Sequence, residues 1–277
     1  MDLCFDKDIL ELLLEIKISN ELKNKEIYSI HYDKTLAYSM LFNNKEKLIT
    51  NYYTSHITSL SEYETIKNIV NNLDENIRVK LNLCSIYPEI ESILKNELKH
   101  TSNLYLMVDL NKDILSQFHK GHKYNIKKGS KLDIESKCFY KQVVPENIME
   151  EFYKSILFSR GNIGGIKKKP YFTHSYQSFI IRKELIKKGK AILTRIEYDK
   201  KISFIFSLIT NNNGRYFDSG YINRTHPFTA HYAHFKLLQT IRSEGKHYYG
   251  LGEINQIDCN KINELKGTLY YKKGFCR

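Results

Sequence analysis

Three consecutive β-rich segments in the second half of the chain constrain its fold most strongly. They run from Ala191 to Tyr198, from Ile202 to Thr210 and from Arg215 to Tyr221. The connections between them, Asp199-Lys200 and Asn211-Asn-Asn-Gly214, are short and rich in turn-forming residues. Connections this short join antiparallel neighbours, because parallel strands need a crossover of a dozen or more residues. The pattern predicts an antiparallel meander.

Helical patterns lie on both sides of this meander along the chain. Segments Pro145 to Phe158 and Tyr176 to Ile186 carry apolar residues on one side, which predicts two amphipathic helices. A third helix is predicted from Pro227 to Ser243, since it starts with a proline and stops before a glycine. Short strands are expected at His247 to Leu251 and at Thr268 to Phe275. This order of elements predicts an α/β fold with a mixed sheet.

The first part of the chain alternates in a similar rhythm. Its predicted elements are strands at Glu26 to Ile30, Leu36 to Phe42, Val79 to Leu83 and Leu104 to Leu110, and helices at Tyr63 to Leu73 and Tyr87 to Leu98. We therefore expect two domains, residues 1–110 and residues 111–277.

Composition excludes several classes of protein. A hydrophobic content of 42% is enough for a buried core, and no run approaches the roughly 18 apolar residues that a membrane span requires. The acidic start differs from the basic start of a signal peptide, so we expect a cytoplasmic protein. The five cysteines are scattered and include no C-x-x-C pair, which indicates reduced thiols and no metal site.

The formal net charge of +12 favours polyanionic partners such as nucleic acid or nucleotide-linked substrates. A solvated lysine surface explains the same number, because lysine is mostly exposed in any protein. Charge alone therefore selects no partner.

Three stretches together resemble a known family. They are Leu104-Tyr-Leu-Met-Val-Asp-Leu110 followed by Tyr124-Asn-Ile-Lys-Lys128, then Arg224-Thr-His-Pro227 leading through a helix into Gly245-Lys-His-Tyr-Tyr-Gly-Leu-Gly252, and finally Leu265-Lys-Gly267 with Tyr271-Lys-Lys-Gly-Phe275. In this order they are similar to motifs of the Fem-type aminoacyltransferases that build peptidoglycan bridges, and of related acetyltransferases in the GNAT superfamily. Cys276 stands where that family usually has glycine.

The resemblance implies a fold and an activity. The fold would be α/β (α+β), with two GNAT-like subdomains, each a mixed, largely antiparallel sheet flanked by helices. The activity would be transfer of an aminoacyl or acyl group onto an amino group of a cell-envelope or surface-polysaccharide precursor. Aminoacyl-tRNA or acyl-CoA would be the donor, and a small molecule, sugar nucleotide or peptide the acceptor, with no permanently bound cofactor. The chain lacks the [RQ]-x-x-G-x-[GA] string of acetyl-CoA enzymes, which disfavours coenzyme A.

The resemblance also implies site residues. Lys272 aligns with the motif lysine of the family and would stabilise the negative charge that develops during acyl transfer. Lys273 is its neighbour, and on a strand it would lie on the opposite face. Asn125 and Lys127, in the basic segment, would contact the donor or substrate.

Other candidates follow from their places in the predicted elements. Asp218, His226 and Glu253 lie at predicted strand or helix ends, where α/β sheets bind ligands, so each is a candidate proton acceptor. Tyr221, Arg224 and Tyr271 are expected to stack on or hydrogen-bond a nucleotide or sugar.

Two other functions remain open at this stage. The first is a non-catalytic RNA-binding module that uses the basic surface. The second is a protein-binding domain that has the fold without its chemistry, because fold does not imply function.

Overall fold

The computed structural model divides the chain into two compact units, Met1–Tyr105 and Leu106–Arg277. The structure describes residues 8–9, 12, 26–33, 36–43, 46–50, 55–56, 60–71, 77–80, 83–84, 89–90, 92–93, 103–161, 176–210, 213–222, 226–255 and 268–275.

The N-terminal unit contains a four-stranded mixed sheet in the order β1-β2-β3-β5. Its elements are β1 (Glu26–Asp33), β2 (Leu36–Asn43), β3 (Glu46–Thr50), β4 (Ser55–His56), α2 (Leu60–Asn71), β5 (Ile77–Lys80) and β6 (Leu83–Cys84). β1, β2 and β3 are antiparallel neighbours, whereas β3 pairs with β5 in parallel across α2. The first two predicted strands and the first helix are confirmed. The strand predicted from Val79 to Leu83 is instead divided between β5 and β6, and the helix predicted from Tyr87 to Leu98 lies mostly outside the described residues.

The C-terminal unit is built on a six-stranded mixed sheet in the order β7-β12-β11-β10-β9-β8. The strands are β7 (Asn103–Asp109), β8 (Glu135–Phe139), β9 (Ala191–Tyr198), β10 (Lys201–Ile209), β11 (Asn213–Tyr221) and β12 (Tyr248–Asn255). β8 to β11 are antiparallel neighbours, and β12 runs parallel to β11. The predicted meander and the predicted α/β class are both confirmed.

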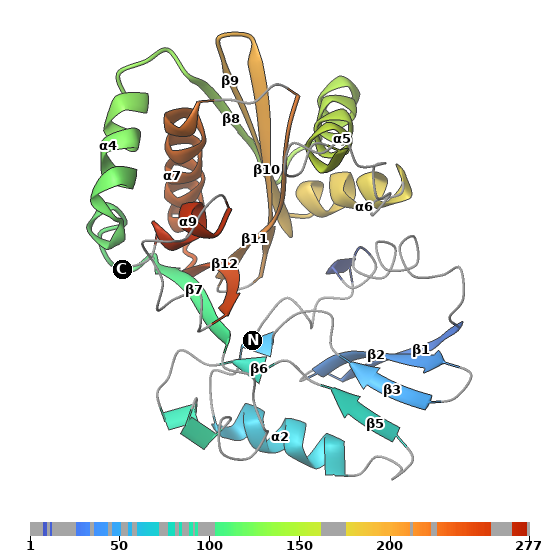
Figure 1. Ribbon diagram of the computed structural model, residues 1–277. Helices are drawn as coiled ribbons and strands as arrows, with labels where there is room; N and C mark the ends of the chain where they lie inside the picture. The colour runs from blue at the N-terminus through green and yellow to red at the C-terminus, as the bar shows by residue number, and fades with distance from the viewer. Residues whose placement is uncertain are drawn as a thin grey trace. The chain divides into compact units, whose positions relative to one another are not determined.

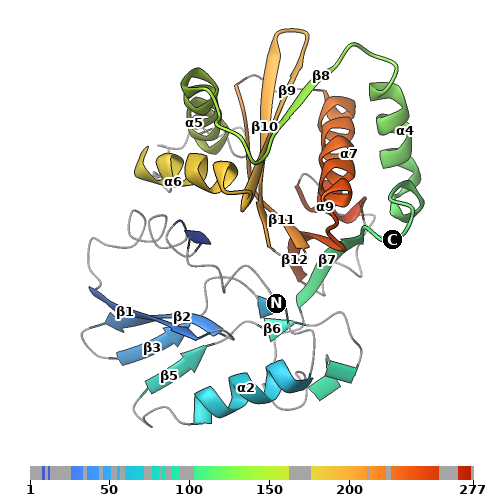
Figure 2. The same cartoon turned by 180° about the vertical axis from the view of Figure 1, so that it is seen from behind.

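Helices cover both faces of this sheet (Figures 1 and 2). α4 (Lys120–Gly129) and α7 (Pro227–Ser243) lie on one face, and α5 (Glu146–Gly161) and α6 (Tyr176–Lys187) lie on the other. β10 is consequently buried from Ser203 to Ile209, which explains why its sequence is almost continuously apolar. On one face Ile205 joins the core beneath α7, and on the other Phe206 packs 5.9 Å from Phe152 of α5, measured between ring centroids.

No helix in the described part of the chain is both long and apolar enough to cross a lipid bilayer.

α7 begins and ends where its sequence predicts. Pro227 occupies the first turn, where its missing N–H costs nothing. Gly245, with a φ of 73°, follows the helix in the left-handed region. Its amide donates to the carbonyl of Arg242 over 3.0 Å, and the amide of Lys246 donates to that of Ile241 over 3.4 Å. Glycine adopts this conformation without steric cost and so ends the helix sharply.

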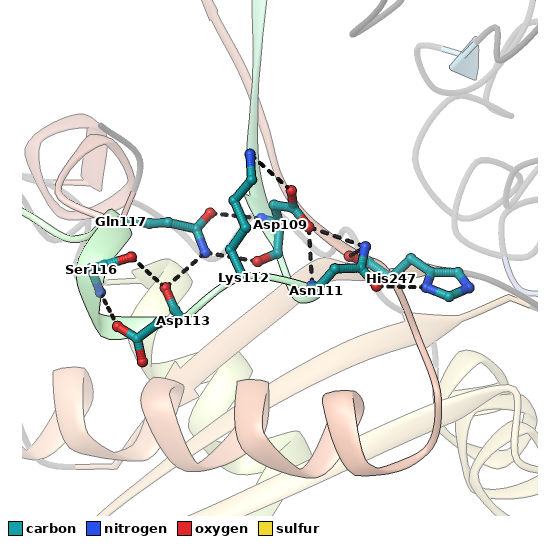
Figure 3. Close-up of polar contacts among 7 residues, drawn as sticks. All are labelled: Asp109, Asn111, Lys112, Asp113, Ser116, Gln117 and His247. Atoms are coloured by element: carbon teal, nitrogen blue, oxygen red, sulfur yellow. Dashed lines mark hydrogen bonds and ion pairs between the residues drawn. The ribbon is translucent and has the colours of Figure 1, made fainter.

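A polar network closes the turn that follows β7 (Figure 3). The side chain of Gln117 pairs with the backbone of Asp109 in both directions, over 2.9 and 2.7 Å. The Asp109 carboxylate accepts from the amide of Asn111 over 3.0 Å. Burial alone would raise the pKa of Asp109, but hydrogen bonds from Asn111 and Lys112 outweigh it and hold that pKa below its ordinary value. Asn111 also contacts His247 over 2.9 Å, so the network connects the end of β7 to the start of β12.

The predicted closing strand from Thr268 to Phe275 is wrong. Residues Thr268–Lys273 form a short helix, α9. The aromatic residues of this segment favour a strand locally, but Tyr271 and Phe275 are four residues apart and therefore share one side of a helical turn. Both join the core on the α4 and α7 side of the sheet, and Phe275 is fully buried there. Burial against the rest of the unit overrides the local preference.

Candidate active site

The parallel strands β11 and β12 pair only at their first residues. The register runs from Asn213 opposite Tyr248 to Arg215 opposite Gly250, although both strands continue for several residues. Immediately afterwards β11 has a bulge, because Ser207 of β10 pairs with Tyr216 while Phe206 pairs with Asp218. A bulge increases twist and turns its strand away from a neighbour. The two strands therefore part toward their carboxyl ends, which is where α/β sheets bind ligands.

The ammonium group of Lys272 lies where these strands part. Its Nζ is 5.0 Å from the centroid of the Tyr216 ring on β11, a cation–π contact. On the β12 side, a Cβ added to Gly252 would lie 3.3 Å from the same Nζ. Tyr216 follows the last paired residue of β11 directly, and Gly252 lies two residues after the last paired residue of β12. The positive charge of Lys272 thus lies close to one residue of each separating strand.

Tyr271 and its carbonyl attach α9 to the rest of the unit. The Tyr271 hydroxyl donates to the carbonyl of Ala230 over 3.0 Å and accepts from Nδ1 of His234 over 3.2 Å. Nε2 of His122, on α4, donates to the Tyr271 carbonyl over 2.8 Å. These contacts hold the residue that precedes Lys272 against two helices.

Three histidines and Phe275 surround this attachment. The rings of His122 and His231 are 4.1 Å apart between centroids, and Phe275 lies 4.7 Å from His234. Burial lowers the pKa of His122 to about 4 and that of His234 to about 3, and it also lowers the pKa of His231. Burial raises the pKa of Tyr271 well above its ordinary value. At neutral pH the cluster is therefore uncharged and adds no positive charge beside Lys272.

Acidification is expected to destabilise the protein through this cluster. The ordinary histidine pKa is 6.5, so below that pH the unfolded chain binds protons at His122, His231 and His234 that the folded chain does not bind. The stabilisation that comes from the neutral histidine cluster is thus fully present above about pH 6.5 and is lost as the pH falls toward 4. Each such histidine removes about 1.4 kcal/mol per pH unit. Urea denaturation between pH 7 and 4.5 measures this slope. His122→Gln should flatten this slope, and a slope equal to that of the parent protein would contradict the assignment.

Gly274 permits His122 to pack on α9. A Cβ added to Gly274 would lie only 1.9 to 2.3 Å from three atoms of the His122 ring. Gly274→Ala should therefore destabilise the protein by about 3 kcal/mol, the upper end of the usual cost of overpacking. Thermal or urea denaturation measures the loss.

Gly245→Ala is the matched control for this substitution. Nothing lies within 4 Å of an added Cβ at Gly245, so only its positive φ of 73° is strained, and the expected loss is about 1 kcal/mol. In a His122→Ala background, Gly274→Ala should cost far less because the obstructing ring is gone. An undiminished cost there would contradict the proposed clash.

Asp218, a predicted proton acceptor, is buried against Arg182 of α6. Nη1 and Nη2 of Arg182 lie 3.3 and 3.4 Å from Oδ2 of Asp218, and the amide of Ser219 donates to Oδ1 over 2.9 Å. Asp218 is 2% exposed and Arg182 is 0% exposed. The guanidinium group is surrounded by the rings of Phe152, Phe179, Phe206 and Phe217. The structure thus shows an ion pair at Asp218, and its role in proton transfer remains a prediction.

His226 and Tyr221 lie in aromatic contacts elsewhere. His226 is exposed at the N-cap position of α7, and its ring stacks on Phe228 with 5.1 Å between centroids. Tyr221 ends β11 and meets Phe158 of α5 edge-on at 5.9 Å. Neither contact involves α9.

The remaining predicted residues are distributed as follows. Lys273 is half-buried in α9 beside Lys272, while Asn125 and Lys127 belong to α4. The backbone of Glu253 lies in β12, one residue after Gly252, and its side chain is outside the described part of the chain, as is all of Arg224. Of the predicted residues, the structure joins Lys272 and Tyr271 in one site.

Sequence reasoning missed Tyr216, Gly252 and His122 as parts of this site. The available signal was the three-residue spacing of His231 and His234, which places both on the buried side of α7. Among the described residues, no group of side chains is arranged to hold a metal ion. The histidines instead pack around the attachment of α9.

Comparison with solved structures shows a FemAB-like fold, and the sequence resemblance is confirmed at that level. Over 95% of this chain and 87% of the other, the structure is similar to FemX, with a TM-score of 0.64 and 12% identity.

Two further solved structures share the fold. One is the C-terminal domain of a putative lysylphosphatidylglycerol synthetase from Agrobacterium fabrum, with a TM-score of 0.54, 10% identity, and 95% and 83% of the two chains covered. The other is L-PGS from Bacillus licheniformis, with a TM-score of 0.52, 11% identity, and 98% and 88% covered. No family model and no curated protein sequence matches the chain.

Proposed function

We propose that this protein is an acyltransferase of the Fem type, which moves an aminoacyl or acyl group onto an amino group of a cell-envelope or surface-polysaccharide precursor in the cytoplasm. One observation carries the proposal, namely the ammonium group of Lys272 between the parting ends of β11 and β12. The FemAB-like fold supports it, since it accommodates FemX and a putative synthetase named for an aminoacylated lipid.

The chemistry assigns one step to Lys272. An acceptor amine attacks the carbonyl carbon of the donor ester or thioester, forming a C–N bond and placing negative charge on the carbonyl oxygen. Lys272 stabilises that oxygen by its positive charge and N–H groups, which act most strongly in the transition state. The C–O or C–S bond of the donor then breaks, and the leaving group takes up the proton released by the amine.

A proton acceptor is needed for the amine. Asp218 is already paired with Arg182, and His226 lies with Phe228. Glu253 remains as the third predicted candidate, and its backbone follows Gly252 directly on β12. We therefore favour Glu253 among the three predicted candidates.

Two sequence features favour aminoacyl-tRNA over acyl-CoA as the donor. The chain lacks the pyrophosphate-binding string of acetyl-CoA enzymes, and its net charge of +12 suits a donor that carries many phosphates.

The test supplies purified protein with charged tRNA or acyl-CoA, together with amino-sugar nucleotides or peptides with free amino groups. Mass spectrometry should detect a new amide that requires both donor and acceptor. Steep salt-dependent RNA binding without turnover by any pair would instead support the non-catalytic RNA-binding module.

A further inference from the structure

One surface of α4 and of the turn that continues it carries lysines at regular spacing. Lys120, Lys123 and Lys127 are three or four residues apart, which places them along one side of α4, and Lys131 follows in the turn after the helix ends. Tyr124 lies among them with 66% of its surface exposed. We name these five residues the α4 lysine face. Its helical part, from Lys120 to Lys127, extends for about 10 Å at the α-helical rise per residue.

No carboxylate neutralises this face within the described part of the chain. α4 itself contains no acidic residue. Lysines elsewhere in the unit do form ion pairs, such as Lys141 with Glu244 at 2.6 Å and Lys154 with Glu150 at 3.6 Å. None of the four lysines of the face forms such a pair among the described residues; the one side-chain bond found is from Lys123 to the carbonyl of Ser116. A row of positive charges without nearby carboxylates favours binding of a polyanion.

The opposite side of α4 distinguishes two candidate polyanionic partners, an anionic membrane and RNA. A helix that lies on an anionic membrane needs an apolar side to insert. In α4 that side carries the buried residues His122 and Ile126. A Cβ added to Gly129 would approach Cβ of Tyr232 on α7 to 2.7 Å, so α4 and α7 are in close contact. No apolar side remains for a membrane, whereas an exposed tyrosine among lysines suits RNA, whose bases stack on aromatic rings.

We propose that the α4 lysine face binds RNA, with the lysines on the phosphates and Tyr124 stacked on a base. The inference deepens the proposed function and rests on it for the identity of that RNA, which would be the aminoacyl-tRNA donor. The binding itself depends only on the geometry and charge of α4.

The experiment measures binding of the full chain to uncharged bulk tRNA between 50 and 200 mM salt. One variant replaces Lys120, Lys123, Lys127 and Lys131 with glutamine. Its control replaces four exposed lysines from other elements, Lys137, Lys154, Lys187 and Lys200, and so has the same net charge. In a plot of log affinity against log salt concentration, we expect the slope for the first variant to be shallower by about 3. Its tRNA affinity at low salt should fall by at least roughly 30-fold. The control variant should stay close to the parent protein in both quantities.

Tyr124 supplies an independent check. Tyr124→Ala should weaken tRNA binding by about 5-fold or more, whereas Tyr124→Phe keeps the ring and should bind like the parent. Equal losses of tRNA affinity in the two lysine variants would mean that tRNA is attracted by the overall positive charge and not by the α4 lysine face. That result would overturn the proposal. So would tRNA binding that the face variant retains while it loses binding to phosphatidylglycerol vesicles.

Failure of this inference is separable from failure of the proposed function. Normal RNA binding through the face without any acyl transfer would refute the proposed acyltransferase function but not the proposed RNA-binding surface. If acyl transfer from charged tRNA survives the replacement of all four lysines, the proposed RNA-binding surface is refuted and the proposed acyltransferase function is not.

Discussion

Lys272→Met is expected to lower kcat/KM for acyl transfer by about 10²- to 10³-fold, the usual cost of removing one oxyanion-stabilising donor. Methionine keeps the unbranched stem, so packing near Tyr216 and Gly252 is retained and only the charge is removed. The loss should fall mainly on kcat, because the interaction is made with charge that develops in the transition state. Steady-state kinetics with saturating acceptor would measure it.

Two comparisons make the Lys272 prediction specific. Lys272→Arg retains a positive charge and should recover part of the lost rate, although its planar group has a different shape. Lys154→Met removes an exposed lysine from α5 and should leave the rate unchanged. Full activity of Lys272→Met, with unchanged stability, would exclude Lys272 from the chemistry.

Asp218→Ala is expected to destabilise the C-terminal unit by about 3–5 kcal/mol, because it leaves the buried Arg182 charge without its carboxylate. Arg182 is 0% exposed and lies between four phenylalanine rings, so water cannot readily replace the lost partner. Urea denaturation monitored by circular dichroism would show the loss as a lower midpoint.

The double variant Arg182→Met, Asp218→Leu separates the ion pair from its surroundings. Methionine packs well among aromatic rings, and replacing a buried ion pair by apolar residues is often close to neutral. The double variant should therefore be far more stable than Asp218→Ala. If Asp218→Asn instead kept full stability and abolished turnover, Asp218 would be a catalytic base and its pairing with Arg182 secondary.

Local signals were sufficient for much of the fold. The meander was predictable because its turns are short and polar, and the limits of α7 because Pro227 and Gly245 act within their own helical turns. The class of the sheet followed from the order of these elements. Each of these features depends on residues that are close in sequence.

The candidate site was predictable only in part, and α9 shows why. Its aromatic and lysine residues favour a strand when read locally, yet Tyr271 and Phe275 are buried against α4 and α7, which a helix permits. Lys272 was identified through its motif, but its neighbours Tyr216 and Gly252 come from two other strands. No sequence pattern connects these three positions.

The amino-acid sequence by itself determined the elements, their order and the presence of a motif lysine near the C-terminus, because propensity, capping and turn formation act over a few residues. The tertiary structure decided where that lysine lies. Three-residue pairing of β11 with β12, the bulge in β11 and the neutral histidine cluster together place the Lys272 ammonium group between the parting strands. These contacts join residues up to 149 positions apart in the chain, and only packing of the whole unit can specify them.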